Sequence, residues 1–119
     1  MNKGQNKDTG NEGEQIACDY LESIGYKILE RNIELGIGEI DILALDKKTV
    51  VLVEVKTVKG SGFGLAKDLV RNAKQRKLRD LARILEQRYP NRAIRIDVIG
   101  VNMAEDPPEI EHLISAVEG

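Results

Sequence analysis

Two carboxylates and a lysine stand at a spacing that suits divalent-metal chemistry. Asp41 lies in the first of two neighbouring aliphatic segments, and Glu54 and Lys56 lie in the second. The segments are Gly38–Leu45 and Val50–Thr57. Both are rich in β-branched and aliphatic residues, so we expect two strands that pair as a hairpin.

The turn between the segments sets the register of this hairpin. A loop at Asp46–Thr49 places Asp41 opposite Glu54 and Glu39 opposite Lys56. Directly opposed residues share a face of the sheet, with Cβ atoms about 4.5–5.5 Å apart, and opposed like charges destabilise the pair. A group that compensates the charge of the two carboxylates is therefore expected.

A hard divalent cation would compensate this charge. Oxygen ligands suit Mg²⁺, or Mn²⁺, and the carbonyl of Val55 is a candidate third ligand beside Asp41 and Glu54. Lys56 would sit beside the metal-bound water, where it could orient or deprotonate that water or stabilise a phosphate. One cysteine and one histidine in the chain exclude a Cys/His zinc site. This set of groups suits hydrolysis of a phosphodiester.

An ordinary solvent-facing hairpin with a Glu39–Lys56 ion pair is the alternative. Against it, the remaining residues of that face are apolar, so the charges do not lie on a wholly polar side. These residues are Leu43, Leu45, Val50 and Leu52. The alternative stays open from the residues alone.

Glu14 is a further candidate, with two interpretations of equal weight. It lies on the apolar stripe of a helix that we expect to begin at Asn11 and end before Gly25, so it could lean over the hairpin. Asn11 and Glu14 also have the spacing of a capping box, in which the glutamate only caps the helix.

A second expected helix, Asn72–Arg88, carries localised positive charge. The stretch from residue 67 to 83 holds seven basic and two acidic residues, a net charge of +5, which leaves −7 on the rest of the chain. A basic helix on an acidic body predicts a phosphate-binding surface. Lys74 shares the apolar side of the helix and is expected to point toward the carboxylates. The candidate nucleic-acid contacts are Lys74, Gln75, Arg76 and Arg79.

Composition excludes several classes of protein. The formal net charge of −2 excludes a bulk polycation, and aromatic residues at 3% argue against a platform for base stacking. No apolar run reaches the roughly 18 residues of a membrane span, and the polar start resembles no signal peptide. We expect a cytoplasmic protein that does not associate with membranes.

The order of the elements predicts a mixed α/β fold with one sheet flanked by helices. Residues 1–10 are polar and are expected to be a disordered lead-in, followed by a single domain over residues 11–119. The expected strands outside the hairpin are Tyr26–Glu30 and Ile94–Val101. A short last element is expected over Ile110–Val117, and the sequence leaves open whether it is a helix or a strand. A glycine-rich loop is expected over Gly60–Gly64.

Several short motifs resemble the YraN-like family of bacterial proteins, over Gly13 to Val117. They are Glu14, Gly38-Glu39-Ile40-Asp41, Val53-Glu54-Val55-Lys56-Thr57, Lys74-Gln75 and Ile96-Asp97-Val98. That family resembles the PD-(D/E)xK restriction-endonuclease-like superfamily, close to Holliday junction resolvases, which implies an αβββαβ core. Ile40 and Val58 depart from the usual proline and arginine of the motifs.

The resemblance implies Asp41, Glu54 and Lys56 as the catalytic set, Glu14 as the acid on the helix, and Mg²⁺ or Mn²⁺ as the cofactor. It implies a metal-dependent endonuclease acting on DNA, with branched or junction DNA as a candidate substrate and a homodimer as a candidate assembly. The alternative is a non-catalytic DNA-binding or repair-accessory module that retains the fold. Three residues have lesser expected roles. Asp97 is a candidate for a local salt bridge or a supporting role, and Cys18 and His112 are expected to be structural.

Overall fold

The expected α/β architecture is confirmed in a computed structural model of the protein, which describes residues 2–58 and 72–117. Side chains are described over residues 11–58 and 75–117. Two helices and five strands follow one another along the chain in the order α1, β1, β2, β3, α2, β4, β5. Their bounds are α1 Asn2–Ser23, β1 Lys27–Glu34, β2 Glu39–Asp46, β3 Thr49–Val58, α2 Asn72–Arg88, β4 Ile94–Asn102 and β5 Glu109–Leu113.

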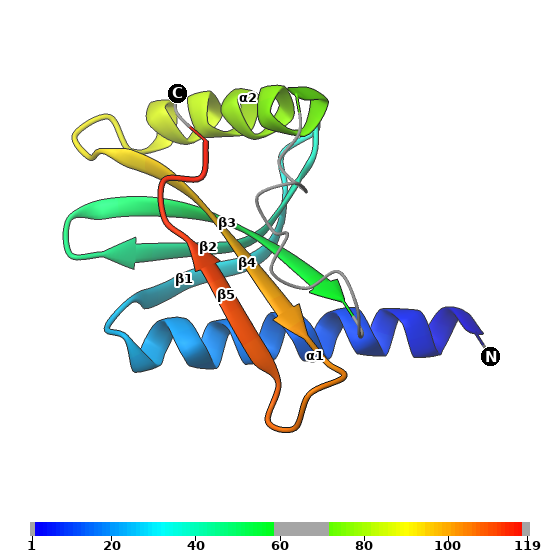
Figure 1. The fold of residues 1–119 in the computed structure, drawn as a ribbon. Helices are drawn as coiled ribbons and strands as arrows, with labels where there is room; N and C mark the ends of the chain where they lie inside the picture. Colours follow the sequence, from blue (N-terminus) through cyan, green and yellow to red (C-terminus); the bar gives the residue numbers. More distant parts are fainter. Residues whose placement is uncertain (1, 59–71, 118–119) are drawn as a thin grey trace.

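The five strands form one mixed sheet in the spatial order β1-β2-β3-β4-β5. The β3–β4 pair is parallel, and the other three pairs are antiparallel. A parallel pair needs a crossover connection, and α2 is the helix of that crossover. Helix α1 covers one face of the sheet and α2 covers the other (Figure 1).

Each helix closes its own hydrophobic core against the sheet. Apolar residues on both faces of β2 and β3 explain this arrangement, because a sheet covered on both sides needs near-continuous apolar strands. The core under α2 includes Leu43, Leu52 and Leu81, and the core under α1 includes Leu21 and Val53. Asp41 and Glu54 share the parity of Leu43 and Leu52, so they belong to the α2 face.

Two elements, α1 and β1, differ from the expected boundaries. Helix α1 begins at Asn2 and not at Asn11, so it includes most of the segment expected to be a disordered lead-in. That segment contains no proline, and a polar composition does not exclude a helix. Strand β1 continues to Glu34 past a register shift between Ile28 and Glu30. The loop expected over Gly60–Gly64 lies outside the described residues.

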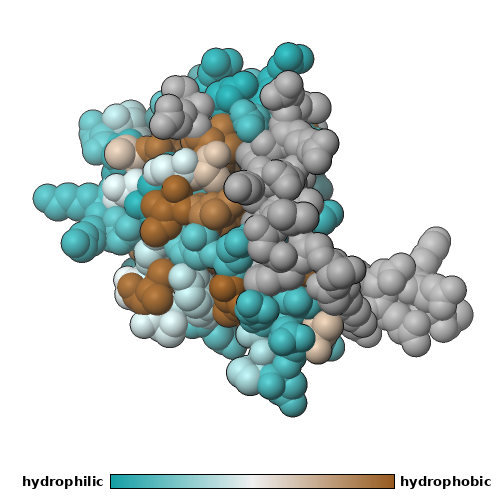
Figure 2. All heavy atoms as spheres, in the orientation of Figure 1, coloured by the Kyte–Doolittle hydropathy of each residue, from teal (hydrophilic) through white to brown (hydrophobic). Residues whose placement is uncertain are grey.

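The sheet has two open edges, β1 and β5. The last element, for which the sequence left helix or strand open, contains most of strand β5, Glu109–Leu113, which pairs antiparallel with β4. In the face shown in Figure 2, hydrophobic residues gather between the levels of the two helices, and hydrophilic residues surround them. Ile114, directly after β5, is 58% exposed. The candidate carboxylates lie away from both edges of the sheet, at the end of the β2–β3 pairing.

Candidate metal and phosphate site

The predicted hairpin register is confirmed over its paired length. Strands β2 and β3 pair from Asp46–Thr49 to Ile42–Val53, with the partners that the turn predicts. The described pairing ends there, one residue before Asp41 would meet Glu54. The two carboxylates therefore lie where strands β2 and β3 diverge, and the divergence opens space between the two strands.

Asp41 replaces a missing backbone partner at this point. Val50 donates its N–H to Ala93 next to β4, so even-numbered residues of β3 face β4 and odd-numbered residues face β2. The N–H of Val55 thus points toward β2, beyond the last pair. It donates to Oδ2 of Asp41 at 2.8 Å. The carbonyl of Val55 lies on the same side of β3, so the predicted third oxygen is next to the Asp41 carboxylate.

Asp41 and Glu54 interact directly. Burial, a hydrogen bond with Glu54 and the charge of Glu54 raise the pKa of Asp41 from its ordinary value of 3.8 to about 8. The hydrogen bond from Val55 opposes this rise. At neutral pH and without metal, a proton on Asp41 therefore removes the like-charge conflict that the sequence predicts.

Glu14 lies with these carboxylates. Its charge contributes to the raised pKa values of both Asp41 and Glu39. Because α1 begins at Asn2, Glu14 lies well inside the helix, and the interpretation of Glu14 as an N-terminal capping residue is wrong. With its amide nitrogen turned toward the site, Asn32 of β1 donates to Glu14 at 3.1 Å and to Glu39 at 3.3 Å.

Gly13 explains how α1 comes so near to β3. A Cβ atom added at Gly13 would lie 2.1 Å from Oγ1 of Thr57. The helix backbone therefore rests on this threonine, and only a residue without a side chain fits. The contact places Glu14, the next residue, beside the end of the hairpin.

A cavity of about 240 Å³ lies between the separated strands and the first half of α2. Its lining residues are Glu39, Asp41, Glu54, Lys77, Leu78 and Leu81. Lys56 is exposed on β3, two residues from Glu54 and on the same face. The alternative Glu39–Lys56 ion pair is not among the ion pairs of the described residues.

The candidate nucleic-acid contacts on α2 are divided between two sides of the helix. Arg76 lines a second cavity with Ile37, Lys77 and Asp80, next to the carboxylates. Arg79 lines a different cavity, with Ala82, Arg83, Glu86, Ile94, Ile96 and Val117. Gln75 is half-buried, and the side chain of Lys74 lies outside the described part of the chain. Among the described side chains of α2, Lys77, which is not one of the candidate contacts, is the cation that lines the carboxylate cavity.

The comparison with known families decides the identity of the chain. Residues 13–101 match the Uncharacterised protein family UPF0102. The chain belongs to this family. The matched region begins at Gly13, directly before Glu14, and includes Asp41, Glu54 and Lys56. The expected resemblance to the YraN-like family is thereby confirmed.

Individual UPF0102 relatives resemble the chain over nearly their whole length. A UPF0102 protein of Geobacter metallireducens is 43% identical, over 95% of this chain and 94% of the relative. One from Desulforamulus reducens is 40% identical, over 95% and 98%. One from Mycobacterium bovis is 44% identical, over 85% of each chain.

A solved structure described as "Structure of EndoMS-dsDNA2 complex" is also similar, with a TM-score of 0.40 and 23% sequence identity. The likeness covers 60% of this chain and 26% of that one, so the UPF0102 chain spans about a quarter of its neighbour. The described helices include none that is long and apolar enough to span a membrane.

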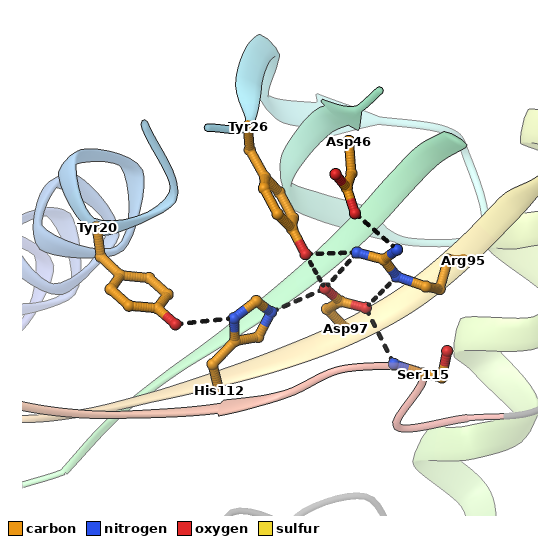
Figure 3. A network of polar contacts seen from close by, with 7 residues as sticks. All are labelled: Tyr20, Tyr26, Asp46, Arg95, Asp97, His112 and Ser115. Atoms are coloured by element: carbon orange, nitrogen blue, oxygen red, sulfur yellow. Dashed lines mark hydrogen bonds and ion pairs between the residues drawn. The ribbon is translucent and has the colours of Figure 1, made fainter. Parts of the chain in front are cut away.

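A second polar cluster of the UPF0102 chain lies on the α1 face, around Asp97 of β4 (Figure 3). The Asp97 side chain is fully buried and accepts hydrogen bonds from Arg95 at 2.9 Å and from the N–H of Ser115 at 3.1 Å. His112 Nε2 lies 2.8 Å from Asp97, and His112 Nδ1 lies 3.1 Å from the hydroxyl of Tyr20. Burial alone would raise the pKa of Asp97, but the hydrogen bonds from His112 and Arg95 hold it below its ordinary value.

This Asp97 cluster confirms the expected salt bridge and gives His112 partners that the sequence does not reveal. Arg95 also donates to Asp46 at 3.0 Å, at the turn of the hairpin. The cluster therefore links β2, β4 and β5 through side chains on the α1 face of the sheet. Cys18 is buried, and burial raises the pKa of its thiol, which fits the expected structural role.

The donor set at the hairpin suits a hard cation. Among the described residues, no group of three or more His, Cys, Asp or Glu side chains could hold a metal ion. Mg²⁺ does not require such a group, because it retains several water ligands and is commonly bound through one or two carboxylates. Asp41, Glu54 and the Val55 carbonyl thus fit Mg²⁺ or Mn²⁺ in chemistry and number.

Proposed function

We propose that this UPF0102 protein is an endonuclease that hydrolyses phosphodiester bonds in DNA with Mg²⁺ or Mn²⁺. The observation that carries the proposal is the placement of Asp41. Its carboxylate contacts the Val55 N–H at 2.8 Å and Glu54 at the point where two strands separate, which brings three oxygen donors together beside an open cavity.

Asp41, Glu54 and the Val55 carbonyl would hold the cation. When bound, the cation would supply a water of lowered pKa and would neutralise charge that develops on the phosphate. The proton on Asp41 must leave before the carboxylate can act as a ligand, so binding is expected to release a proton. Glu14, which also pairs with Arg31 at 3.9 Å, and Glu39 add acidic groups around the site, which favours a cation over an anion there.

Lys56 is the candidate catalytic residue of the chain. Its exposed ammonium stands on the face of β3 that carries Glu54. There it can orient the attacking water or contact a non-bridging phosphate oxygen. In the hydrolysis, the water oxygen adds to phosphorus, one P–O ester bond breaks, and the departing oxygen gains a proton.

Charge on α2 supports DNA as the substrate class. The chain has a net charge of −2, yet Arg76 and Lys77 lie beside the carboxylate cavity. Such cations neutralise backbone phosphates and position a strand without reading its sequence. We further propose branched or junction DNA as the substrate and a homodimer as the assembly, from the resemblance, and a cytoplasmic location, from composition.

A cleavage assay tests the proposed activity. Wild-type protein is incubated with labelled duplex and branched DNA, with Mg²⁺, Mn²⁺ or EDTA. We expect products with either metal and none with EDTA. Lys56→Ala should bind DNA and metal but lose cleavage, while Lys48→Ala, an exposed lysine at the hairpin turn, should cleave normally.

The result that favours the alternative is equally specific. If the wild-type protein binds DNA and Mg²⁺ but cuts none of these substrates, the nuclease proposal fails. A non-catalytic DNA-binding or repair-accessory module would then be the better description.

A further inference from the structure

We infer that Lys77 is a phosphate-binding residue of this site and holds the DNA strand against the metal-binding carboxylates. The inference deepens the proposed function and rests on it for the identity of the ligand. Lys77 lines the cavity that contains Glu39, Asp41 and Glu54, and it also lines the neighbouring cavity with Arg76 and Ile37. Among the described residues, Lys77 is therefore the one that lines both cavities.

The Lys77 side chain lies close over Gly38. A Cβ atom added at Gly38 would lie 2.7 Å from Cε and 3.5 Å from Nζ of Lys77. Among the described glycines, the positive φ angles belong to Gly25 and Gly36, so the backbone at Gly38 does not itself require glycine. The missing side chain instead leaves room for the lysine stem, directly before Glu39.

The rest of α2 supports this path of the lysine. Leu81, one turn after Lys77, is buried, and a Cβ atom added at Gly38 would lie 3.7 Å from its Cδ1 atom. Residues four apart share a side of a helix, so Lys77 and Leu81 approach Gly38 together. The stem of Lys77 thus packs on the start of β2 while its charged end stays at the cavity.

Lys77 faces carboxylates without being neutralised by them. The described residues include no ion-pair partner for its ammonium, although three acidic residues line the same cavity. The intervening space separates a cation from a cluster of acidic side chains. A phosphate with a divalent cation fits such a space by charge, because the metal would contact the carboxylates and a phosphate oxygen would contact the lysine.

The salt dependence of DNA binding tests the inference directly. Binding of a labelled duplex is measured by fluorescence anisotropy at several salt concentrations, with Ca²⁺ in place of Mg²⁺. Each neutralised phosphate contributes about 0.9 to the slope of log K against log salt on duplex DNA. We expect Lys77→Met to reduce the slope by about one and the affinity by roughly three- to tenfold. Lys77→Arg should retain the slope.

Arg83→Met is the matched control. Arg83 is an exposed cation of the same helix, but it lines the cavity with Arg79, not the carboxylate cavity. Its loss should leave the slope unchanged. If Lys77→Met has the same slope as the wild type, or if Arg83→Met lowers the slope equally, the inference is overturned. A wild-type protein that binds no DNA overturns it as well.

Calorimetry with Mg²⁺ alone provides a second readout of opposite sign. Removing a cation near the carboxylates should tighten Mg²⁺ binding by about two- to fivefold, because the repulsion between the ammonium and the metal is lost. A merely structural role would weaken metal binding with DNA binding. Neither measurement requires cleavage, so a wild-type protein that never cuts would refute the nuclease proposal without deciding the role of Lys77.

Discussion

Replacing Asp41 by asparagine should change how stability depends on pH. In the metal-free folded state, Asp41 keeps its proton up to a pKa of about 8. In the unfolded chain an aspartate loses it near pH 4, at a pKa of about 3.9. Between these values the folded state binds more protons than the unfolded state, so the free energy of unfolding falls as the pH rises.

The size of this effect follows from the two pKa values. One pKa unit corresponds to about 1.4 kcal/mol, so the contribution lost between pH 4 and pH 7 is about 4 kcal/mol. Asparagine cannot ionise, and its carbonyl can still accept the Val55 N–H while its amide donates to Glu54. The variant should therefore fold, lack this part of the pH dependence, and be more stable than the wild type at pH 7.

Urea unfolding in EDTA at pH values from 4 to 8 measures the difference. The free energy of unfolding of the wild type relative to Asp41→Asn should decline steadily across this range. Titrating groups away from Glu54 are common to both proteins, so the comparison isolates the Asp41–Glu54 pair. Parallel curves for the two proteins would refute the raised pKa of Asp41, and an unfolded variant would show that the carboxylate is structural.

Three further predictions concern other parts of the site and its supports. Mg²⁺ should raise the melting temperature of the wild type by mass action, and Glu54→Gln should abolish this rise in a thermal melt, whereas an equal rise in both would contradict the metal site. Gly13→Ala should lower the free energy of unfolding, measured in urea, by about 1–3 kcal/mol, because the added methyl would lie too close to Thr57. A gain in stability, as alanine gives in an ordinary helix, would disprove the close contact. Asp97→Asn should destabilise the protein by about 3–5 kcal/mol, since Arg95 would lose its buried partner, and near-wild-type stability by calorimetry would argue against the cluster.

Local patterns explain why the hairpin and α2 were predictable from the sequence. A tight turn at Asp46–Thr49 fixes the register of the strands that it joins, and the pairs up to Ile42–Val53 follow from it. Helix α2 has the predicted bounds, Asn72–Arg88, because its apolar stripe is periodic and Pro90 lies just beyond its end. Both features depend on residues that are close in the chain.

Long-range contacts explain what the sequence did not predict. Tyr26, directly before β1, and His112 of β5 meet at Asp97 of β4, and no local spacing in the sequence links these three residues. The approach of Lys77 to Gly38 is a second contact of this kind, because the pattern of α2 does not reveal that Lys77 lines the carboxylate cavity. A chain pattern gives the side of a helix but not what stands opposite it.

The hydrogen bond between Val55 and Asp41 makes one backbone proton a reporter of the site. Most amides of β3 bond to neighbouring strands, but the Val55 amide bonds to a titratable side chain. A hydrogen bond to a charged acceptor is shorter and stronger than one to a neutral acceptor, so the chemical shift of this proton should move as Asp41 ionises. In an ¹⁵N-labelled sample, its resonance should titrate with a midpoint near the Asp41 pKa of about 8. Added Mg²⁺ should produce a comparable displacement at constant pH, so nuclear magnetic resonance can follow the ionisation of the site without a substrate.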